Sequence, residues 1–299
     1  YYDHSIDTTN TEQGDPIYYY YGNVSSSVQD VANAGQLYVT NSTNFTITNF
    51  TITHDGVRMI LADECNITNS TINTNGTSIY GIYSYYSDNT EMYYNNITVY
   101  GNNSDVIFVE DTIGNKVIEN TIYSAASSGA DGVKLYISNY NLVEKNIIEV
   151  DGIGAVGIYS YNYADDNNIT DNTVTTHSSS TGIQIAGLSH RNKVINNTVL
   201  TDAITAINIG ESDNSTISQN IINASGSSNY GIYVQTCNLV LVTNNTINTS
   251  GSNGYGLYLQ SMINSNVSDN IVRTSGTNAY GMYLHSNTGN STLLNNNIT

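Results

Sequence analysis

The sequence is poor in basic residues and contains one proline, two cysteines and no tryptophan. Seven lysines and arginines stand against 25 aspartates and glutamates, so the formal net charge is -18 over 299 residues. This balance argues against nucleic acids and anionic membranes as partners, because phosphate binding needs clustered lysine and arginine. No apolar run reaches the roughly 18 residues that a membrane-spanning helix needs, so no membrane span is predicted.

The chain contains many acceptor sequences for N-linked glycans. A chain rich in asparagine and threonine produces some Asn-x-Ser/Thr sequons by chance, but we expect several of them to carry glycans. The chain begins without methionine, and we expect a mature product whose leader has been removed. Both features predict an extracellular protein at the cell surface. The eighteen sequons begin at Asn23, Asn41, Asn44, Asn49, Asn66, Asn69, Asn75, Asn96, Asn102, Asn168, Asn196, Asn214, Asn223, Asn244, Asn248, Asn266, Asn290 and Asn297.

A short phrase, Tyr-Gly-apolar-Tyr, returns along the chain at residues 80–83, 230–233, 255–258 and 280–283. Within each repeat of about 25 residues, three apolar columns occupy short segments that are rich in β-branched residues and separated by Gly- and Asn-rich turns. No segment sustains the 3.6-residue period of a helix. The pattern predicts an all-β parallel solenoid with three strands per coil. Ten repeats begin at Asp55, Tyr80, Asp105, Asp131, Val156, Thr181, Thr205, Tyr230, Tyr255 and Tyr280.

A column of asparagines lies between the second and third strand of these repeats. Stacked asparagines can hydrogen-bond to one another and satisfy the backbone groups of turns. The predicted ladder consists of Asn95, Asn120, Asn146, Asn172, Asn197, Asn220, Asn245, Asn270 and Asn296. In its apolar columns and this ladder the chain resembles the right-handed parallel β-helix of pectin-lyase-like and NosD-type repeat proteins. The resemblance implies a single-stranded β-helix of about eleven coils over residues 33–299, counting an irregular coil at 33–54.

The two ends of the predicted β-helix differ. Residues 24–40 resemble the entrance of that family, where a short amphipathic helix precedes the first strand. We therefore predict an N-terminal arm and cap helix over residues 1–32, which would cover the edge of the stack. At the other end the chain stops on a third strand at Thr299, and we expect either a following segment or the docking of another copy there.

The repeated phrase predicts an outward-facing aromatic stripe. Strand alternation places Leu257 and Leu259 in the core and Gly256 and Tyr258 on the outside. Three interpretations stay open: stacking that stiffens the strands, contact with a neighbouring subunit, and stacking on sugars. The stripe consists of Tyr83, Phe108, Tyr159, Tyr233, Tyr258 and Tyr283.

The two cysteines lie too far apart to pair within one chain. Seven coils of about 4.8 Å separate Cys65 from Cys237, roughly 34 Å in all, whereas a disulfide needs Cα atoms within about 7 Å. They are either buried free thiols or the partners of an intermolecular disulfide, Cys65 of one subunit with Cys237 or Cys65 of another.

The best catalytic candidates are Asp165 and Asp166 with His190, Arg191 and Lys193 one coil later. They resemble the Asp-Asp, His and Arg-x-Lys elements of pectin-degrading hydrolases, but His190 and Arg191 share one coil. The Asn-Thr-Asp and Gly-His-Gly motifs of those hydrolases are also missing. We interpret the group as a surface ion pair and predict no catalytic residues and no enzymatic activity.

The sequence shows no spacing of histidines that is typical of a metal site, and we predict no catalytic metal and no cofactor. Calcium at oxygen ligands is the weak alternative. It would use Asp105, Glu110 and Asp111, or Asp165, Asp166 and Asp171.

In its sequon-dense composition, rich in Asn, Thr and Tyr, the chain is similar to surface-layer, adhesin-like and sheath proteins of methanogenic archaea. This resemblance implies a structural subunit of a sheath, surface layer or fibre, which self-assembles through the β-helix ends and tyrosine-rich faces and has further copies of itself as partners. The first alternative is a cell-surface adhesin or carbohydrate-binding protein, and the second is a polysaccharide lyase or hydrolase.

Overall fold

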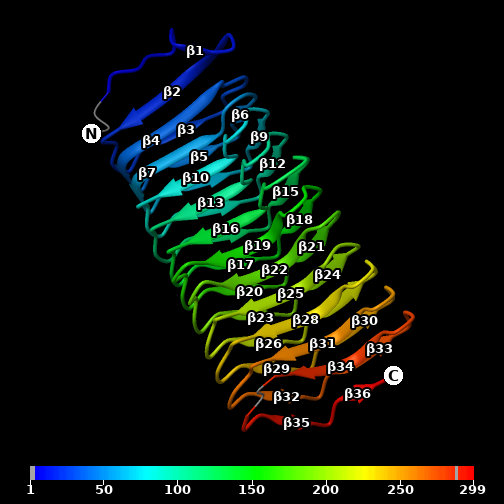
Figure 1. Cartoon of the computed structure of the whole chain (residues 1–299). Coiled ribbons are helices and arrows are strands. Elements are labelled where there is room, and N and C mark those ends of the chain that lie inside the picture. Colours follow the sequence, from blue (N-terminus) through cyan, green and yellow to red (C-terminus); the bar gives the residue numbers. More distant parts are fainter. Residues whose placement is uncertain (1–3, 287–288) are drawn as a thin grey trace.

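The computed structural model describes residues 4–286 and 289–299, which form an elongated parallel β-solenoid (Figure 1). From β2 onwards, consecutive strands of the chain lie in different sheets, and each strand pairs with the strand one coil away. Three sheets of 13, 12 and 11 strands therefore run along the molecule. This is the predicted fold, and the shortest sheet corresponds to eleven complete coils of three strands.

The strands are short and regularly spaced. The first sheet contains β1 (Thr11–Glu12), β2 (Asp15–Tyr21), β4 (Gln36–Thr43), β7 (Val57–Asp63), β10 (Ile82–Tyr85), β13 (Ile107–Glu110), β16 (Val133–Tyr136), β19 (Val156–Tyr161), β22 (Thr181–Ala186), β25 (Thr205–Gly210), β28 (Tyr230–Gln235), β31 (Tyr255–Gln260) and β34 (Tyr280–His285). The second contains β3 (Ser27–Gln29), β5 (Thr46–Thr48), β8 (Asn66–Thr68), β11 (Glu91–Tyr93), β14 (Lys116–Ile118), β17 (Leu142–Glu144), β20 (Asn168–Thr170), β23 (Lys193–Ile195), β26 (Thr216–Ser218), β29 (Leu241–Thr243), β32 (Asn266–Ser268) and β35 (Thr292–Leu294). The third contains β6 (Thr51–Ile52), β9 (Thr71–Thr74), β12 (Asn96–Val99), β15 (Thr121–Ser124), β18 (Ile147–Val150), β21 (Thr173–Thr176), β24 (Thr198–Thr201), β27 (Ile221–Ala224), β30 (Thr246–Thr249), β33 (Ile271–Thr274) and β36 (Asn297–Ile298).

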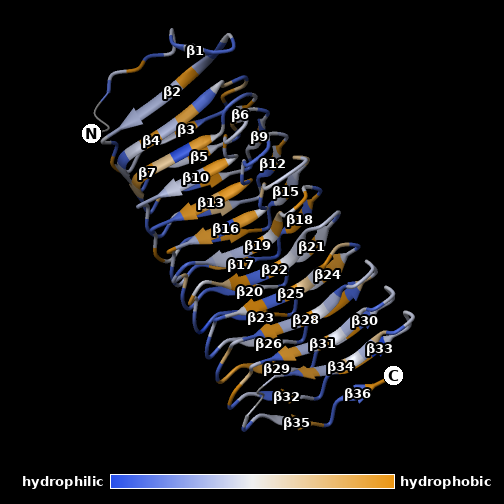
Figure 2. Ribbon diagram, in the orientation of Figure 1, coloured by the Kyte–Doolittle hydropathy of each residue, from blue (hydrophilic) through white to orange (hydrophobic). Residues whose placement is uncertain are grey.

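Inward side chains from all three sheets fill one continuous core. Ile72, Ile97 and Ile122 follow one another along the third sheet and are at most 1% exposed. Figure 2 shows hydrophobic residues that recur along the strands of successive coils. Because β-branched side chains suit a pleated sheet, each coil repeats the same packing at the strand spacing of about 4.8 Å.

The predicted asparagine column forms a buried hydrogen-bonded ladder. Asn146 is representative: its Oδ1 atom accepts from the backbone N–H of Asn120 at 2.9 Å and from Asn120 Nδ2 at 3.0 Å. Its own Nδ2 atom donates to the carbonyl oxygen of Val117 at 2.8 Å and to Asn172 Oδ1 at 2.9 Å. Each asparagine thus ties one coil to the coils before and after it.

A second, shorter ladder lies in the turns between the first and second sheets, and we did not predict it. The backbone N–H of Asn115 donates to Asn141 Oδ1 at 2.8 Å. In the same way, Asn141 donates to Asn167 Oδ1 at 2.8 Å and Asn167 donates to Asn192 Oδ1 at 2.9 Å. The signal was available in the sequence, because these residues recur at the repeat spacing five positions before the first ladder.

The predicted N-terminal cap helix is wrong. Residues 27–29 form strand β3, which pairs with β5 and extends the second sheet. Residues 1–32, expected as an arm and helix, instead add strands to two sheets over their described part, 4–32. Val28 and Val31 do pack against the core, but from a chain with left-handed turn residues at Ser25 and Asp30. Val28 and Val31 are three residues apart, which fits one face of a helix and also two inward positions of a coil. The segment forms a strand because β3 can pair with the otherwise open edge of the second sheet.

Tyrosines close the N-terminal end of the core. On β2, the rings of Tyr18 and Tyr20 lie 5.4 Å and 5.0 Å from those of Phe50 and Phe45. Strand β1 then pairs antiparallel with β2 and covers part of the remaining edge. No helix in the described part of the chain is long and apolar enough to cross a membrane.

Candidate functional site

The outer face of the first sheet carries most of the tyrosines. In β31, Leu257 and Leu259 are fully buried, whereas Tyr255, Tyr258 and Gln260 alternate with them and are half-buried on the outside. All six residues of the predicted stripe lie on this face and are half-buried. The strand period therefore placed the central tyrosine of the repeated phrase correctly.

The glycine of the phrase faces inward, contrary to our expectation. Gly256 is buried, and a Cβ atom there would overlap Val272 in the third sheet. The register passes from Tyr255 to Leu257 without a ladder partner for Gly256, so two successive residues point towards the core. The lack of a side chain lets the first and third strands of one coil approach each other.

The aromatic stripe is divided into two clusters. We name Tyr230, Tyr233, Tyr255, Tyr258, Tyr280 and Tyr283 the C-terminal tyrosine cluster. Its outer row stacks, with ring centroids 5.4 Å apart for Tyr230 and Tyr255 and 5.5 Å apart for Tyr255 and Tyr280. Tyr258 packs edge-on against Tyr233 with centroids at 5.1 Å. The rings thus form a continuous aromatic surface over three coils.

Amide groups border the C-terminal tyrosine cluster. The Tyr233 hydroxyl lies 2.6 Å from Gln235 Oε1 and 2.7 Å from Gln260 Oε1, and donates its proton to one of them. His285 continues this row, and its ring lies 6.1 Å from that of Tyr283. The surface therefore combines flat apolar rings with neutral hydrogen-bonding groups at the coil spacing.

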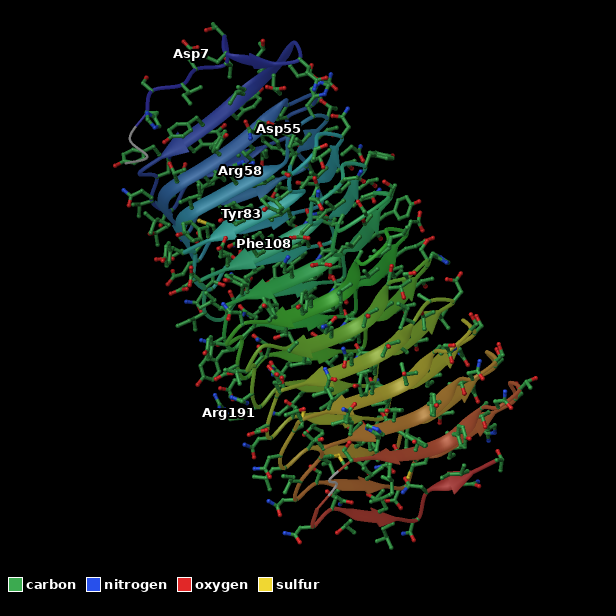
Figure 3. The ribbon with its side chains drawn as sticks, viewed as in Figure 1. Asp7, Asp55, Arg58, Tyr83, Phe108 and Arg191 are labelled. Carbon is green, nitrogen blue, oxygen red and sulfur yellow. The ribbon has the colours of Figure 1, made fainter. Side chains whose placement is uncertain are left out.

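The second cluster, towards the N-terminus, includes charged residues. We name Tyr80, Tyr83, Tyr85, Phe108, Tyr136, Tyr159 and Tyr161 the N-terminal aromatic cluster. Figure 3 shows Arg58, Tyr83 and Phe108 following one another along this face. The Arg58 guanidinium lies 5.9 Å from the centre of the Tyr83 ring, and the Tyr83 hydroxyl donates to Glu110 Oε2 at 2.5 Å. Burial and this carboxylate raise the pKa of Tyr83.

Two coils without aromatic residues separate the clusters. Their outward positions carry Gln184 and Asn208, and the Asn208 Oδ1 atom is buried without a hydrogen-bond partner among the described residues. The predicted stripe therefore consists of Tyr83, Phe108 and Tyr159 in one cluster and Tyr233, Tyr258 and Tyr283 in the other.

A charged group lies inside the N-terminal aromatic cluster. Lys134 Nζ lies 3.5 Å from Asp105 Oδ2, 3.4 Å from Asp131 Oδ2 and 5.5 Å from the centre of the Phe108 ring. The Asp131 Oδ1 atom accepts the backbone N–H of Val156 at 2.8 Å. Burial, followed by the neighbouring Asp105 carboxylate, raises the pKa of Asp131 to about 7. The Asp131 carboxyl therefore keeps its proton to a higher pH than an exposed aspartate does.

We expect Asp131 to make the stability of the protein depend on pH. Its pKa is higher in the folded chain, at about 7, than the value of about 3.9 in the unfolded chain, so the free energy of unfolding should fall as pH rises between these values. Asp131→Asn keeps the acceptor for Val156 and should remove this part of the pH dependence, measured from urea unfolding at pH 4 to 8. The exposed Asp269→Asn is the control. Equal pH dependence in wild type and Asp131→Asn would contradict the assignment.

The catalytic candidates form an ion pair at a surface turn. Arg191 Nη2 lies 2.9 Å from Asp165 Oδ2 and 2.8 Å from Asp166 Oδ2, and these side chains are partly exposed. His190 uses its Nδ1 atom to accept the backbone N–H of Asp213 at 2.9 Å. The His190 ring therefore stabilises the turn. Both carboxylates, of Asp165 and Asp166, are paired with Arg191, so neither is free to act on a substrate in this arrangement.

One group of side chains could hold a metal ion. Among the described residues, Glu149, Asp151 and His177 place their ligand atoms within 4.8 Å of one another. Asp202 also contacts His177 at 3.0 Å and raises the pKa of the imidazole. Neither acidic group that we considered for calcium forms such a cluster in the described part of the chain.

Both cysteines are free and buried. Cys65 is 0% and Cys237 is 3% exposed, and burial raises the pKa of each thiol to about 11. Disulfide formation requires an accessible thiolate, so burial disfavours the intermolecular disulfide, which stays a prediction. Electrophoresis without reducing agent would detect it as a covalent dimer.

Comparison with known proteins agrees with this architecture. The family model described as "Right handed beta helix region" matches residues 35–199, more than half of the chain, and that of "Periplasmic copper-binding protein (NosD)" matches residues 156–299. No curated protein matches the chain in sequence.

Three solved structures illustrate the likeness. The A-module of mannuronan C-5 epimerase from Azotobacter vinelandii has a TM-score of 0.59 at 14% identity and covers 88% of this chain and 86% of its own. A periplasmic alginate epimerase has a TM-score of 0.54 at 12% identity, and the match covers 95% of this chain and 76% of the epimerase. PfbA, a surface adhesin of Streptococcus pneumoniae, has a TM-score of 0.51 at 14% identity, and the match covers 85% of this chain and 77% of PfbA. At these identities the likeness shows the fold alone.

These structures correct our prediction that the protein is not an enzyme. Mannuronan C-5 epimerase and alginate epimerase are enzymes built on the same fold, so the fold gives no ground for excluding catalysis. The prediction rested on missing motifs of pectin-degrading hydrolases, and those motifs describe only one chemistry that this fold supports.

Proposed function

Because this chain belongs to the family of right handed beta helix proteins, we propose that it is an exported polysaccharide-binding protein which holds a glycan on the C-terminal tyrosine cluster. The cluster and its row of amides carry the proposal. Export to the periplasm or the cell surface is supported by the NosD match and by the adhesin among proteins of similar fold. The sequons are a further argument for export.

The repeat of the solenoid suits a repeating ligand. Identical side chains recur on this face at the coil spacing of about 4.8 Å. A linear polysaccharide also presents the same groups again and again, so one register of binding can satisfy several coils together. Tyrosine offers an apolar ring and a polar hydroxyl, and Gln235 and Gln260 add hydrogen-bonding groups beside the rings.

The charge of the protein favours a neutral glycan. The formal net charge of -18 repels acidic polymers. In the C-terminal tyrosine cluster and its bordering row, His285 is the one residue with a side chain that can become positively charged. We therefore propose an uncharged chain of sugars as the ligand of this face.

We expect Tyr258→Ala to weaken glycan binding about tenfold, or 1.4 kcal/mol, because Tyr258 contacts tyrosines of both neighbouring coils. Tyr258→Phe keeps the ring and should retain most of the affinity. The measurement is a glycan array with the purified protein, followed by calorimetry of each variant. Tyr140→Ala, at an exposed tyrosine outside both clusters, is the control. Unchanged binding by Tyr258→Ala would refute the assignment of this face.

The N-terminal aromatic cluster favours a second candidate, a polysaccharide-modifying enzyme. Asp131, a nearly buried carboxyl whose pKa is raised to about 7, lies beside the half-buried Lys134 ammonium group. Such a pair can move a proton near neutral pH. Turnover of a polysaccharide that Asp131→Asn and Lys134→Met abolish, while binding persists, would support this candidate, and full activity of both variants would refute it.

Self-assembly into a sheath, surface layer or fibre is the remaining candidate. Tyrosine is enriched at protein interfaces, and the C-terminal tyrosine cluster lies on the outer face of the first sheet. Filaments or lattices in electron micrographs would support this candidate, and a monomer at high concentration would oppose it.

The copper named in the NosD description has no sulfur-ligand site in the described residues. Thiolate and thioether ligands select copper(I), whereas imidazole with further nitrogen or oxygen ligands suits copper(II) and other divalent ions. Both thiols are buried in the core, and the candidate cluster among the described residues offers one imidazole, from His177, with two carboxylates. These residues therefore provide no copper(I) site and nothing that selects copper(II) over other divalent ions.

A further inference from the structure

A trough of about 620 Å³ runs along the outer side of the third sheet. Five consecutive coils line it, each with the outward residue of its third strand and the first residue of the following turn. Strands β21, β24, β30 and β33 mark this side in Figure 1. Four strand spacings of about 4.8 Å make it roughly 19 Å long. The tyrosine clusters belong to the first sheet, so the trough is a separate surface.

Neutral polar groups dominate the trough. In its middle, Asn248 Nδ2 donates to Asn223 Oδ1 at 2.9 Å; Asn223 is exposed and Asn248 is half-buried. Ser225 and Ser250 also line the trough, at the starts of their turns. These amides and hydroxyls repeat at the coil spacing, as hydroxyl groups do along a linear glycan.

The trough carries charged side chains of both signs near its two ends. Asp202 lies at one end, where it contacts His177, and Arg273 lies towards the other. Glu149 and Asp151 add negative charge beyond His177. Nothing in the lining favours a polymer with charge of one sign.

We propose that the trough is a second saccharide-binding site, which takes a linear, uncharged oligosaccharide along the solenoid axis. It stands independently of the proposed function, because none of its lining residues belongs to the C-terminal tyrosine cluster. If both sites bind, one molecule holds two glycan chains on different sides and links them. Asn223 and Asn248 begin sequons, so a glycan attached to either would occupy the trough itself.

The test uses the full chain produced in a host without N-glycosylation. Binding of cello-, manno- and chito-oligosaccharides is measured by calorimetry for wild type, Asn248→Ala and Ser250→Trp, which fills the trough. Ser252→Trp, in the same turn but outside the lining, is the matched control. We expect a loss of about tenfold for Asn248→Ala and complete loss at this site for Ser250→Trp.

The outcomes separate the two sites. The Tyr258→Ala variant is expected to bind one oligosaccharide per molecule at the trough. If adding Ser250→Trp to this variant abolishes that binding, the trough is a saccharide site, whether or not the tyrosine face binds a glycan. Wild-type affinity and stoichiometry in both trough variants would overturn the proposal, and so would the absence of binding by every oligosaccharide. If Ser250→Trp fails to fold, Asn248→Ala decides the question alone.

Discussion

Asn146→Ala is expected to destabilise the protein by about 4 kcal/mol. The substitution leaves the backbone N–H of Asn120 without its acceptor and removes one acceptor of Asn120 Nδ2, which keeps the carbonyl oxygens of Met92 and Ile118. It also removes the donor from the carbonyl oxygen of Val117. Each buried polar group without a partner costs about 1 to 3 kcal/mol, and these groups lie too deep for water to replace the side chain. The measurement is the free energy of unfolding in guanidinium chloride.

Asn168→Ala is the control for the ladder. Asn168 lies on the neighbouring strand β20 with its side chain exposed, so its loss should change stability by at most about 0.5 kcal/mol. Equal stability of the two variants would show that the ladder contributes nothing beyond the packing of the apolar columns. The coils of a solenoid can unfold separately when the interface between two of them is weakened. Unfolding of Asn146→Ala in more than one transition would therefore also agree with the expected role of the ladder.

Gly251→Ala is expected to destabilise the protein by about 3 kcal/mol. In the turns after the third strands, Gly226, Gly251 and Gly276 stack directly on one another. A Cβ atom at Gly251 would overlap the carbonyl oxygen of Gly226, which belongs to the backbone of the adjacent coil. A backbone atom cannot rotate aside, so the two coils must separate locally and lengthen their hydrogen bonds.

Gly210→Ala provides the comparison for Gly251→Ala. A Cβ atom there meets only the flexible end of Gln235, at 3.0 Å, so we expect a loss below about 1 kcal/mol. Thermal unfolding of the two variants beside wild type measures the difference. If Gly251→Ala and Gly210→Ala unfold at the same temperature, the stacked turns have more room than the structure shows.

The periodic part of the fold could be predicted because each coil repeats the same physical requirement. Apolar columns such as Ile72, Ile97 and Ile122 recur at fixed spacing only if their side chains stack in one core. The same spacing indicated the asparagine column that contains Asn146. The N-terminal end could not be predicted in this way, because Val28 and Val31 fit either a helix or a coil.

The functional surfaces were harder to predict than the fold. Strand alternation placed Tyr258 on the outside, but it gave no sign that Gln184 and Asn208 divide the aromatic face into two clusters with different charge. The inward turn of Gly256 depends on a local break in the strand register. The trough is lined by outward strand residues and by turn residues. Strand alternation predicts which strand residues face outward, but it does not predict the path of the turns.

The structure of the protein bound to its polysaccharide would test the central claim most directly. After a neutral glycan has been identified on the array, crystals of the complex should show sugar rings over Tyr255 and Tyr258, with hydroxyl groups in contact with Gln235 or Gln260. A glycan bound elsewhere, with the C-terminal tyrosine cluster bare or covered by a second copy of the chain, would contradict the account.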